Sequence, residues 1–290
     1  MIDKARATVV TTVALFLLSA VSLLSGCNAV SLLQSREERA QSVAQENGWT
    51  KQQFATGQYT ITGFRPRYSR GSDALAVYIE GDGVAWVTPT VISSDPTPDT
   101  PLTLSLAVQD PTPNRIYLAR PCQYAPQREL AQCDPAFWTS HRYAPEILAS
   151  LNKAIDQAKQ ESGAQHIRVF GYSGGGNLAI LIASQRTDVT AIVTIAGNID
   201  HGAWTRAHGD TPLFGSLDAV DVADSVAHIP QTHFVGEEDD VVPPHVSASY
   251  AGHAGDTSRL SIINVSGADH DCCWVEKWPS LLKAYVYRRH

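Results

Sequence analysis

Short apolar runs separated by polar, turn-forming segments recur along the chain from residue 59 onward. Residues 147–158 place their apolar side chains on one helical face, and residues 177–185 have a second helical pattern. Strand-like runs, either alternating or nearly continuous in apolar residues, lie at 59–64, 74–79, 114–119, 166–172, 189–195, 232–235 and 259–265. This pattern predicts an α/β fold in which a mostly parallel central sheet has helices on both faces.

The most informative stretch runs from His166 to Ile180, where a strand pattern meets a helix pattern at Gly171-Tyr172-Ser173-Gly174-Gly175. Glycines on both sides of Ser173 let the strand and the helix pass close together, while the serine sits in a strained turn with its Oγ exposed. The serine then lies at a helix N-terminus, where free N–H groups favour an oxyanion. A glycine-rich turn with an incidental serine is the simpler alternative. A phosphate-binding loop fits less well because no lysine follows the glycines.

The first residues have the pattern of a targeting segment. Lys4 and Arg6 precede an apolar run at 7–24, which ends in Leu24-Ser25-Gly26-Cys27. This ending resembles a bacterial lipobox, which implies cleavage before Cys27 and lipid attachment to its thiol. In the lipobox pattern, Asn28 after the cysteine implies the outer membrane, with the protein facing the periplasm. A single transmembrane anchor is the alternative, because the run approaches the ~20 residues that span a bilayer.

The charge of the chain argues against a nucleic-acid-binding protein, and its length fits one large domain. The chain has 22 Lys and Arg against 29 Asp and Glu, and its net charge of −7 gives no basic patch to suggest a nucleic-acid partner. We expect a signal peptide at 1–26, a lipidated cysteine and polar tether at 27–58, and one domain at 59–290. The tether expectation rests on the polar residues that follow Asn28, of which 36–44 have a helical pattern. The oligomeric state is left open.

Two later loops carry a second resemblance. The strand at 232–235 leads into Gly236-Glu237-Glu238-Asp239-Asp240-Val241-Val242-Pro243. The pattern Gly-x-x-Asp-x-Val-Val-Pro resembles the acid turn of the α/β-hydrolase superfamily and assigns the acid to Asp239. The family's histidine lies after the last strand, where this chain has His270. Ser173, Asp239 and His270 occur in the order typical of that fold, and the resemblance, which covers residues 59–290, implies a serine hydrolase that works through an acyl-enzyme.

The strand at 74–79 ends in Glu80-Gly81-Asp82-Gly83, upstream of the nucleophile turn. In α/β hydrolases this turn supplies half of the oxyanion hole, so we expect the backbone N–H groups of Asp82 and Gly174 to be the two donors, with Gly83 as the alternative to Asp82. The Asp82 carboxylate must then turn away from the oxyanion. Glu80 stands where these hydrolases usually have histidine, and an ordinary turn after a strand is the alternative.

The segment from Gly197 to Ala227 is long and contains several large apolar residues among polar ones. The resemblance implies a small substrate-facing flap after this strand, and a surface excursion is the alternative. Aromatic side chains that could line a substrate pocket, or simply belong to the core, are Trp86, Trp138, Trp204, Phe214 and Trp274.

Four cysteines remain if Cys27 carries lipid, and three pairings are open to them. Adjacent Cα atoms lie ~3.8 Å apart, below the usual disulfide range, whereas Cys122 and Cys133 flank a loop of suitable length. We expect the bridge Cys122–Cys133, which leaves Cys272 and Cys273 either free or in a strained bond. A metal site at 269–273 is the weaker interpretation, and we expect no metal and no cofactor.

Taken together, the sequence predicts a lipid-anchored serine hydrolase of the bacterial cell envelope. We expect it to cleave a carboxylic ester or a similar acyl bond in a small-molecule or acyl substrate. A peptidase or amidase on the same scaffold is the close alternative. A binding or assembly lipoprotein without turnover is a third, and Glu80 is the feature that favours it.

Overall fold

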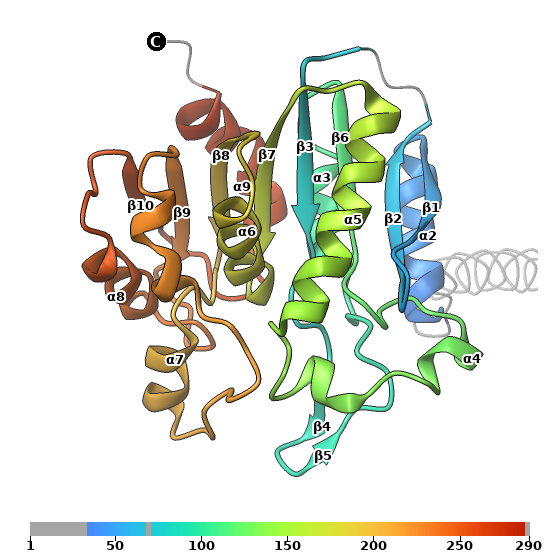
Figure 1. Cartoon of the computed structure of the whole chain (residues 1–290), viewed down its shortest axis with the longest axis horizontal. Coiled ribbons are helices and arrows are strands. Elements are labelled where there is room, and N and C mark those ends of the chain that lie inside the picture. The colour runs from blue at the N-terminus through green and yellow to red at the C-terminus, as the bar shows by residue number, and fades with distance from the viewer. Residues whose placement is uncertain (1–33, 68–70, 288–290) are drawn as a thin grey trace, which may run out of the picture.

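Eight strands form one sheet at the centre of the computed structural model, which describes residues 34–67 and 71–287 (Figure 1). Their order across the sheet is β1-β2-β6-β3-β7-β8-β9-β10. Neighbours from β6 to β10 are parallel, whereas β2 pairs antiparallel with both β1 and β6. The expected mostly parallel sheet is confirmed. The strands are β1 (Trp49–Ala55), β2 (Thr60–Pro66), β3 (Ala74–Ile79), β6 (Asn114–Leu118), β7 (His166–Tyr172), β8 (Val189–Ile195), β9 (Gln231–Gly236) and β10 (Leu260–Val265).

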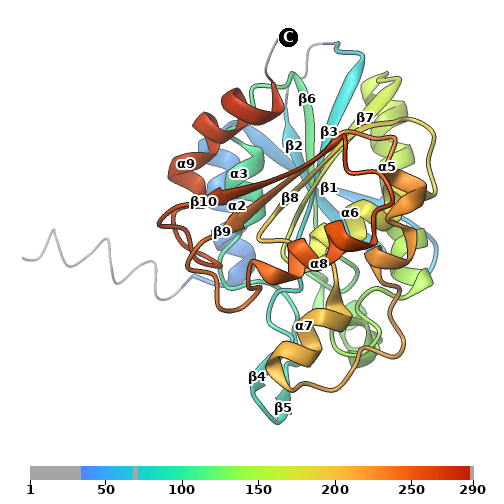
Figure 2. The same cartoon turned by 90° about the vertical axis from the view of Figure 1, so that its left-hand side faces the viewer.

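Helices cover both faces of this sheet (Figure 2). One face packs against α5 (Pro145–Ser162), α6 (Gly174–Ser184) and α8 (His245–His253). The other packs against α2 (Arg36–Glu46), α3 (Leu102–Ala107) and α9 (Trp274–Leu281). Each face therefore has its own apolar core.

The position of the central strand β3 between two cores explains why its sequence is almost continuously apolar. Val77 and Ile79 point into the core beneath α5 and α6, whereas Ala76 and Tyr78 point into the core beneath α3 and α9. All four side chains are fully buried. Successive residues of a strand face opposite sides, so a strand with a core on each side has no position left for a polar residue.

Shorter elements connect the sheet and the helices. A two-stranded hairpin of β4 and β5 projects from the edge of the molecule where the parallel strands end (Figure 1). The segment expected as a flap contains one helix and two 3₁₀ turns. These elements are β4 (Trp86–Thr88), β5 (Val91–Ile92), α4 (Gln127–Leu130), η1 (Pro135–Trp138), α7 (His201–His208), η2 (Ala219–Val222), η3 (Asp224–Val226) and the π-helical turn η4 (Leu282–Val286).

The expected tether at 27–58 is wrong over most of its length. Helix α2 buries Ala40 and Ala44 in the core, and β1 pairs with β2 over all of its residues. The polar residues of β1 predict a tether, but β1 is an edge strand, which exposes some of its side chains and tolerates polar residues at those positions. The fold thus begins well before residue 59.

The signal segment expected at 1–26 and the lipidation expected at Cys27 lie outside the described residues. In residues 34–67 and 71–287, no helix is both long enough and apolar enough to cross a membrane.

Two disulfides are formed among the residues that the structure describes. Cys122 pairs with Cys133, as expected, with Cα atoms 6.2 Å apart. Cys272 pairs with the adjacent Cys273, which answers the question that the sequence left open. Both cysteines of the segment 269–273, which the sequence analysis considered for a metal site, are therefore bonded to each other. Within the described residues, no three His, Cys, Asp or Glu side chains form a group that could hold a metal ion.

Candidate active site

The turn between β7 and α6 brings Ser173 to the surface. Ser173 has φ +51° and ψ −123°, a backbone conformation that is strained for a residue with a side chain. A Cβ on Gly171 would overlap the backbone of Gly175, and a Cβ on Gly175 would overlap the carbonyls of Ile79 and Glu80. Glycine is thus required on both sides of the serine, as the sequence predicts, and the serine is the partly exposed apex of a tight strand-to-helix turn.

Asp239 lies in the turn that follows β9 and is oriented by the backbone. Its Oδ1 accepts hydrogen bonds from the N–H groups of Val241 at 3.0 Å and Val242 at 2.7 Å. Its Oδ2 lies 2.9 Å from Nδ1 of His270, and its side chain has no exposed surface. Asp240 next to it is exposed. The structure therefore brings Asp239, and not Asp240, against the histidine.

His270 completes a chain of hydrogen bonds. Its Nε2 lies 3.1 Å from Oγ of Ser173, on the opposite side of the ring from Asp239. A carboxylate only accepts hydrogen bonds, so Nδ1 carries the proton and Nε2 is free to accept one from the serine. The three residues singled out from the sequence are thus contiguous, at the ends of β7, β9 and β10.

Two aromatic side chains hold the His270 loop, and only one of them, Trp274, was a candidate from the sequence. Tyr172, next to the serine, places its hydroxyl 3.1 Å from the carbonyl of His270 and 2.9 Å from Asp271 Oδ1. Trp274 donates its indole N–H to the carbonyls of Asp269 and His270. Trp274 is fully buried, so it belongs to the core and not to a pocket.

The turn after β3 lies against the nucleophile. A Cβ on Gly81 would come within 3.2 Å of the Ser173 Cβ, and Gly174 is packed against the carboxyl group of Asp82. As the first residue of α6, Gly174 has an N–H with no intrahelical partner. The backbones expected to supply the oxyanion hole are therefore adjacent to Ser173.

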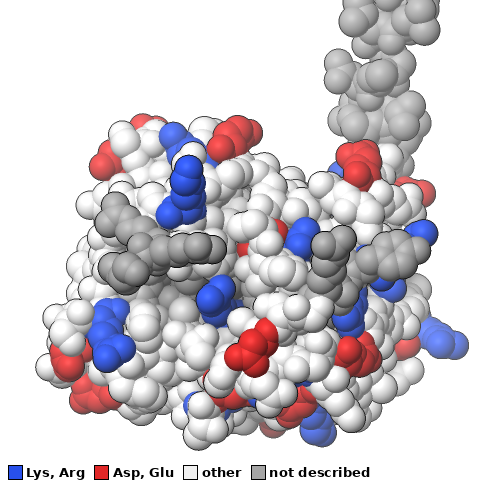
Figure 3. All heavy atoms as spheres, turned by 90° about the horizontal axis from the view of Figure 1, so that it is seen from above, with Lys and Arg blue, Asp and Glu red and all other residues white. Residues whose placement is uncertain are grey.

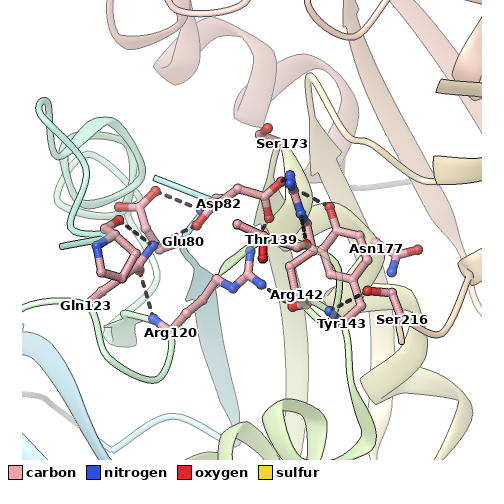
Figure 4. A network of polar contacts seen from close by, with 12 residues as sticks. Glu80, Asp82, Arg120, Gln123, Thr139, Arg142, Tyr143, Ser173, Asn177 and Ser216 are labelled. Atoms are coloured by element: carbon pink, nitrogen blue, oxygen red, sulfur yellow. Dashed lines mark hydrogen bonds and ion pairs between the residues drawn. The ribbon is translucent and has the colours of Figure 1, made fainter. Parts of the chain in front are cut away.

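The Asp82 carboxylate is held by two arginines and a tyrosine (Figure 4). Arg120 pairs with Oδ1, while Oδ2 accepts from Arg142 at 2.8 Å and from the Tyr143 hydroxyl at 3.2 Å. The Ser173 hydroxyl points away from this cluster (Figure 4). The carboxylate lies against Gly174, one of the expected oxyanion donors, and its charge is compensated by the two arginines.

The arginines are buried and oriented. Only 4% of the Arg120 side chain and 8% of the Arg142 side chain are exposed. Arg120 also donates to the carbonyl of Arg142, which in turn donates from Nε to the carbonyl of Thr139 at 2.7 Å. Burial of the Asp82 carboxyl opposes its ionisation, but the charges and hydrogen bonds of Arg142 and Arg120 outweigh burial and lower its pKa to about 2.

Glu80, which stands where the family usually has histidine, is buried and held by hydrogen bonds from neighbouring elements. It accepts hydrogen bonds from the Gly81 N–H at 2.9 Å, the Thr103 hydroxyl at 2.5 Å and the Tyr117 hydroxyl at 2.8 Å. Burial raises the pKa of this carboxyl above its usual value, although the three donors act in the opposite direction. Glu80 thus links the turn after β3 to α3 and β6.

A cleft of about 930 Å³ opens beside the serine. Ser173, His270, Asp82 and Arg142 line it, as does Trp204, whose indole N–H donates to the Val241 carbonyl at 2.7 Å. The segment 197–227 therefore contributes to the cleft through α7, as expected of a flap. Of the other candidate aromatic residues, Trp138 is buried, while Trp86 and Phe214 are exposed.

A second cavity of about 630 Å³ lies next to the cleft. The two share Arg142 and Trp204 in their walls, and the Arg142 guanidinium lies 5.9 Å from the centre of the Trp204 ring. Trp86 from the hairpin and Leu213 from the flap segment form other parts of the second wall.

The body of the flap segment is fastened to the scaffold. Asn177 of α6 donates to the Leu217 carbonyl at 3.0 Å and accepts from the Ala219 N–H at 2.8 Å. Ser216 accepts from the Tyr143 N–H at 3.1 Å (Figure 4). These hydrogen bonds fasten the segment directly after the exposed Phe214.

Comparison with solved structures identifies the fold. The chain is similar to Est1E from Butyrivibrio proteoclasticus, with a TM-score of 0.57 and 13% identity over 81% of this chain and 97% of that one. It is similar to the Pyrococcus furiosus esterase Pf2001, with a TM-score of 0.55 and 14% identity over 81% and 90%. It is also similar to the α/β hydrolase GrgF from Penicillium, with a TM-score of 0.53 and 14% identity over 79% and 92%. The chain has the α/β-hydrolase fold.

No protein-family model matches the chain, and no curated protein matches its sequence.

The buried ion cluster predicts a stability effect. Asp82→Asn should lower the free energy of unfolding at neutral pH by about 3 kcal/mol, because two buried arginines lose their counterion. The folded-state pKa of Asp82 lies below its ordinary value, so its contribution is complete above pH ~4 and is lost as the pH falls towards about 2. Urea unfolding at a series of pH values measures both effects.

The matched control is Asp240→Asn, which removes an exposed carboxylate from the lining of the same cleft. It should change the free energy of unfolding by less than about 0.5 kcal/mol. Equal urea midpoints for the two variants would contradict the role given to Asp82.

Proposed function

We propose that this protein is a serine hydrolase that cleaves a carboxylic ester or a similar acyl bond. The observation that carries the proposal is the hydrogen-bonded chain from Asp239 through His270 to Ser173, which opens into the cleft. The distances, 2.9 Å and 3.1 Å, lie within the range that proton transfer requires. The solved structures with the same fold, one of them called an esterase and another an α/β hydrolase, support the same conclusion.

In the proposed reaction, Ser173 Oγ attacks the carbonyl carbon of the substrate while His270 Nε2 takes the serine proton. Asp239 holds the Nδ1–H tautomer and stabilises the imidazolium. His270 then returns the proton to the leaving group, and an acyl group remains on Ser173. Water, activated by the same histidine, releases the acid and restores the serine.

The oxyanion of the tetrahedral intermediate would be bound by the N–H groups of Asp82 and Gly174. Two arginines surround the single carboxylate of Asp82, so the cluster formed by these three side chains has a net positive charge close to the developing oxyanion. This charge would favour the intermediate over the neutral substrate. Through its hydrogen bonds to Asp82, the cluster would also fix the position of the donating backbone.

We further propose that the protein is lipid-anchored in the bacterial envelope. The support is the sequence Leu24-Ser25-Gly26-Cys27 after an apolar run and two basic residues. Cells fed radiolabelled palmitate should produce a labelled protein, and Cys27→Ser should abolish the label, because the thiol at 27 is the proposed attachment point. A labelled Cys27→Ser protein would show that the lipid is elsewhere.

Ser173→Ala tests the nucleophile. This variant should lose both ester hydrolysis and labelling by a fluorophosphonate, which reacts with activated serines. Its free energy of unfolding should change by less than about 1 kcal/mol, because the lost hydroxyl opens no core cavity. Labelling and unfolding curves measure the two effects. Persistent labelling in the variant would refute the assignment, and an unlabelled wild-type chain would favour a binding protein without turnover.

Asp239→Asn tests the acid. It should lower kcat on a p-nitrophenyl ester by a factor on the order of 10³ to 10⁴, because an amide stabilises the wrong histidine tautomer and cannot balance the imidazolium charge. Asp240→Asn is the control and should leave kcat within about threefold, an effect smaller than ~1 kcal/mol. If the larger loss occurs at Asp240, the acid is one residue further along the turn.

A further inference from the structure

Exposed apolar side chains of the described residues gather at one end of the molecule. Five of them form what we call the apolar rim, which consists of Trp86, Val87, Val91 and Ile92 of the β4–β5 hairpin and Phe214 of the flap segment. Val87 is 65% exposed and Phe214 is 84% exposed. Isolated exposed apolar residues are common on soluble proteins, but a contiguous patch of them marks a surface that binds something.

The rim lies beside the candidate active site. The hairpin follows directly on the Gly81–Gly83 turn, and Trp86 lines the second cavity together with Pro212 and Leu213. That cavity shares two side chains with the cleft beside Ser173. Figures 1 and 2 both show the hairpin and the segment after α7 projecting from the end where the parallel strands finish.

The rim also lacks charge. Neither residues 84–93 nor residues 211–217 contain an Asp, Glu, Lys, Arg or His. The opposite end of the molecule, in contrast, carries both signs of charge interspersed across its surface (Figure 3). An uncharged tip with an exposed tryptophan is typical of a segment that enters the interfacial region of a membrane.

The start of the described chain lies at the same end. Arg36, at the beginning of α2, pairs with Asp99 at 2.7 Å, and Pro98, Asp99 and Thr100 line the cleft. Cys27 precedes Gln34 by seven residues, which can span at most about 25 Å when fully extended. A lipid on Cys27 would therefore keep this end of the domain close to a bilayer.

We propose that the apolar rim docks on the surface of a lipid bilayer, so that the cleft opens onto the membrane and receives an ester whose hydrocarbon part is held there. This inference rests on the proposed hydrolase function and on the proposed anchor. Asp210 and Asp240 are acidic and exposed near the rim, whereas Arg142 in the wall of the second cavity is already paired with Asp82. The surface is therefore suited to zwitterionic lipid better than to anionic lipid.

A fluorescent label tests the docking. The full chain is reconstituted in phosphatidylcholine vesicles, with an NBD group attached at Val87→Cys or, as the control, at Thr257→Cys. Thr257 is exposed and precedes β10, at the end of the sheet opposite the rim. Wild-type chain treated with the same reagent gives the background.

The Val87 label should show a shorter emission wavelength and be quenched by doxyl-labelled lipid, while the Thr257 label should not. Identical behaviour of the two labels would overturn the proposal. A shifted emission without quenching by lipid would also overturn it, because another protein surface, such as a second copy of the chain, would then cover the rim.

A pair of substrates tests the consequence for turnover. The double variant Val87→Ser/Phe214→Ser should lower hydrolysis of p-nitrophenyl palmitate in the vesicles at least about tenfold, because two apolar side chains no longer enter the lipid. Hydrolysis of the soluble p-nitrophenyl acetate should stay within about twofold. Tyr285→Ser, which alters an exposed aromatic residue outside the rim, is the control and should affect neither substrate by more than that.

An equal loss on both substrates, or no loss on either, would contradict the role of the rim. Fluorophosphonate labelling of Ser173 is measured alongside. If the serine does not react and neither ester is cleaved, the hydrolase function fails, while the quenching result still decides whether the rim meets the bilayer.

Discussion

The strained turn at Ser173 is the constraint on which the rest of the site depends. Its positive φ is sustained because β7 lies between two apolar cores, because α6 packs in one of them, and because glycines at 171 and 175 let the chain fold back on itself. This turn lies in the middle of the sheet, at the edge where six strands end. The short loops after β9 and β10 can therefore bring Asp239 and His270 to this one hydroxyl.

Much of this arrangement could be predicted from the sequence. The buried strands are recognisable as apolar runs because a core lies on each side of them, and β3 and β8 were predicted with their correct bounds. Asp239 and His270 were predicted as partners of Ser173 because residues 236–243 and the loop after the last strand resemble the acid turn and the histidine loop of α/β hydrolases. Parallel strands bring their carboxyl ends together, so position in the chain implied position in space.

Other features could not be predicted because their sequence signal is weak. Edge strand β1 has only Trp49 and Phe54 buried, and the hairpin after Gly83 contains Pro89 and a strand of two residues. The pairing of Asp82 with Arg120 and Arg142 joins three loops far apart in sequence, and spacing carries no information about such a contact. Of these three residues, only Arg120 could have been placed near the site from the sequence, because it follows closely on the buried strand β6 at the edge that carries the site.

The ion cluster behind the turn after β3 has a consequence for how such a sequence can change over time. Asp82, Arg120 and Arg142 lie on different loops, yet replacing Asp82 removes the counterion of two buried arginines, and replacing either arginine leaves buried acceptors of the cluster without their donor. Single substitutions are therefore disfavoured at all three positions, although changes made together could be tolerated. Homologues should keep the three side chains as a set or lose them as a set, and the turn that faces the serine would diverge only along with distant loops.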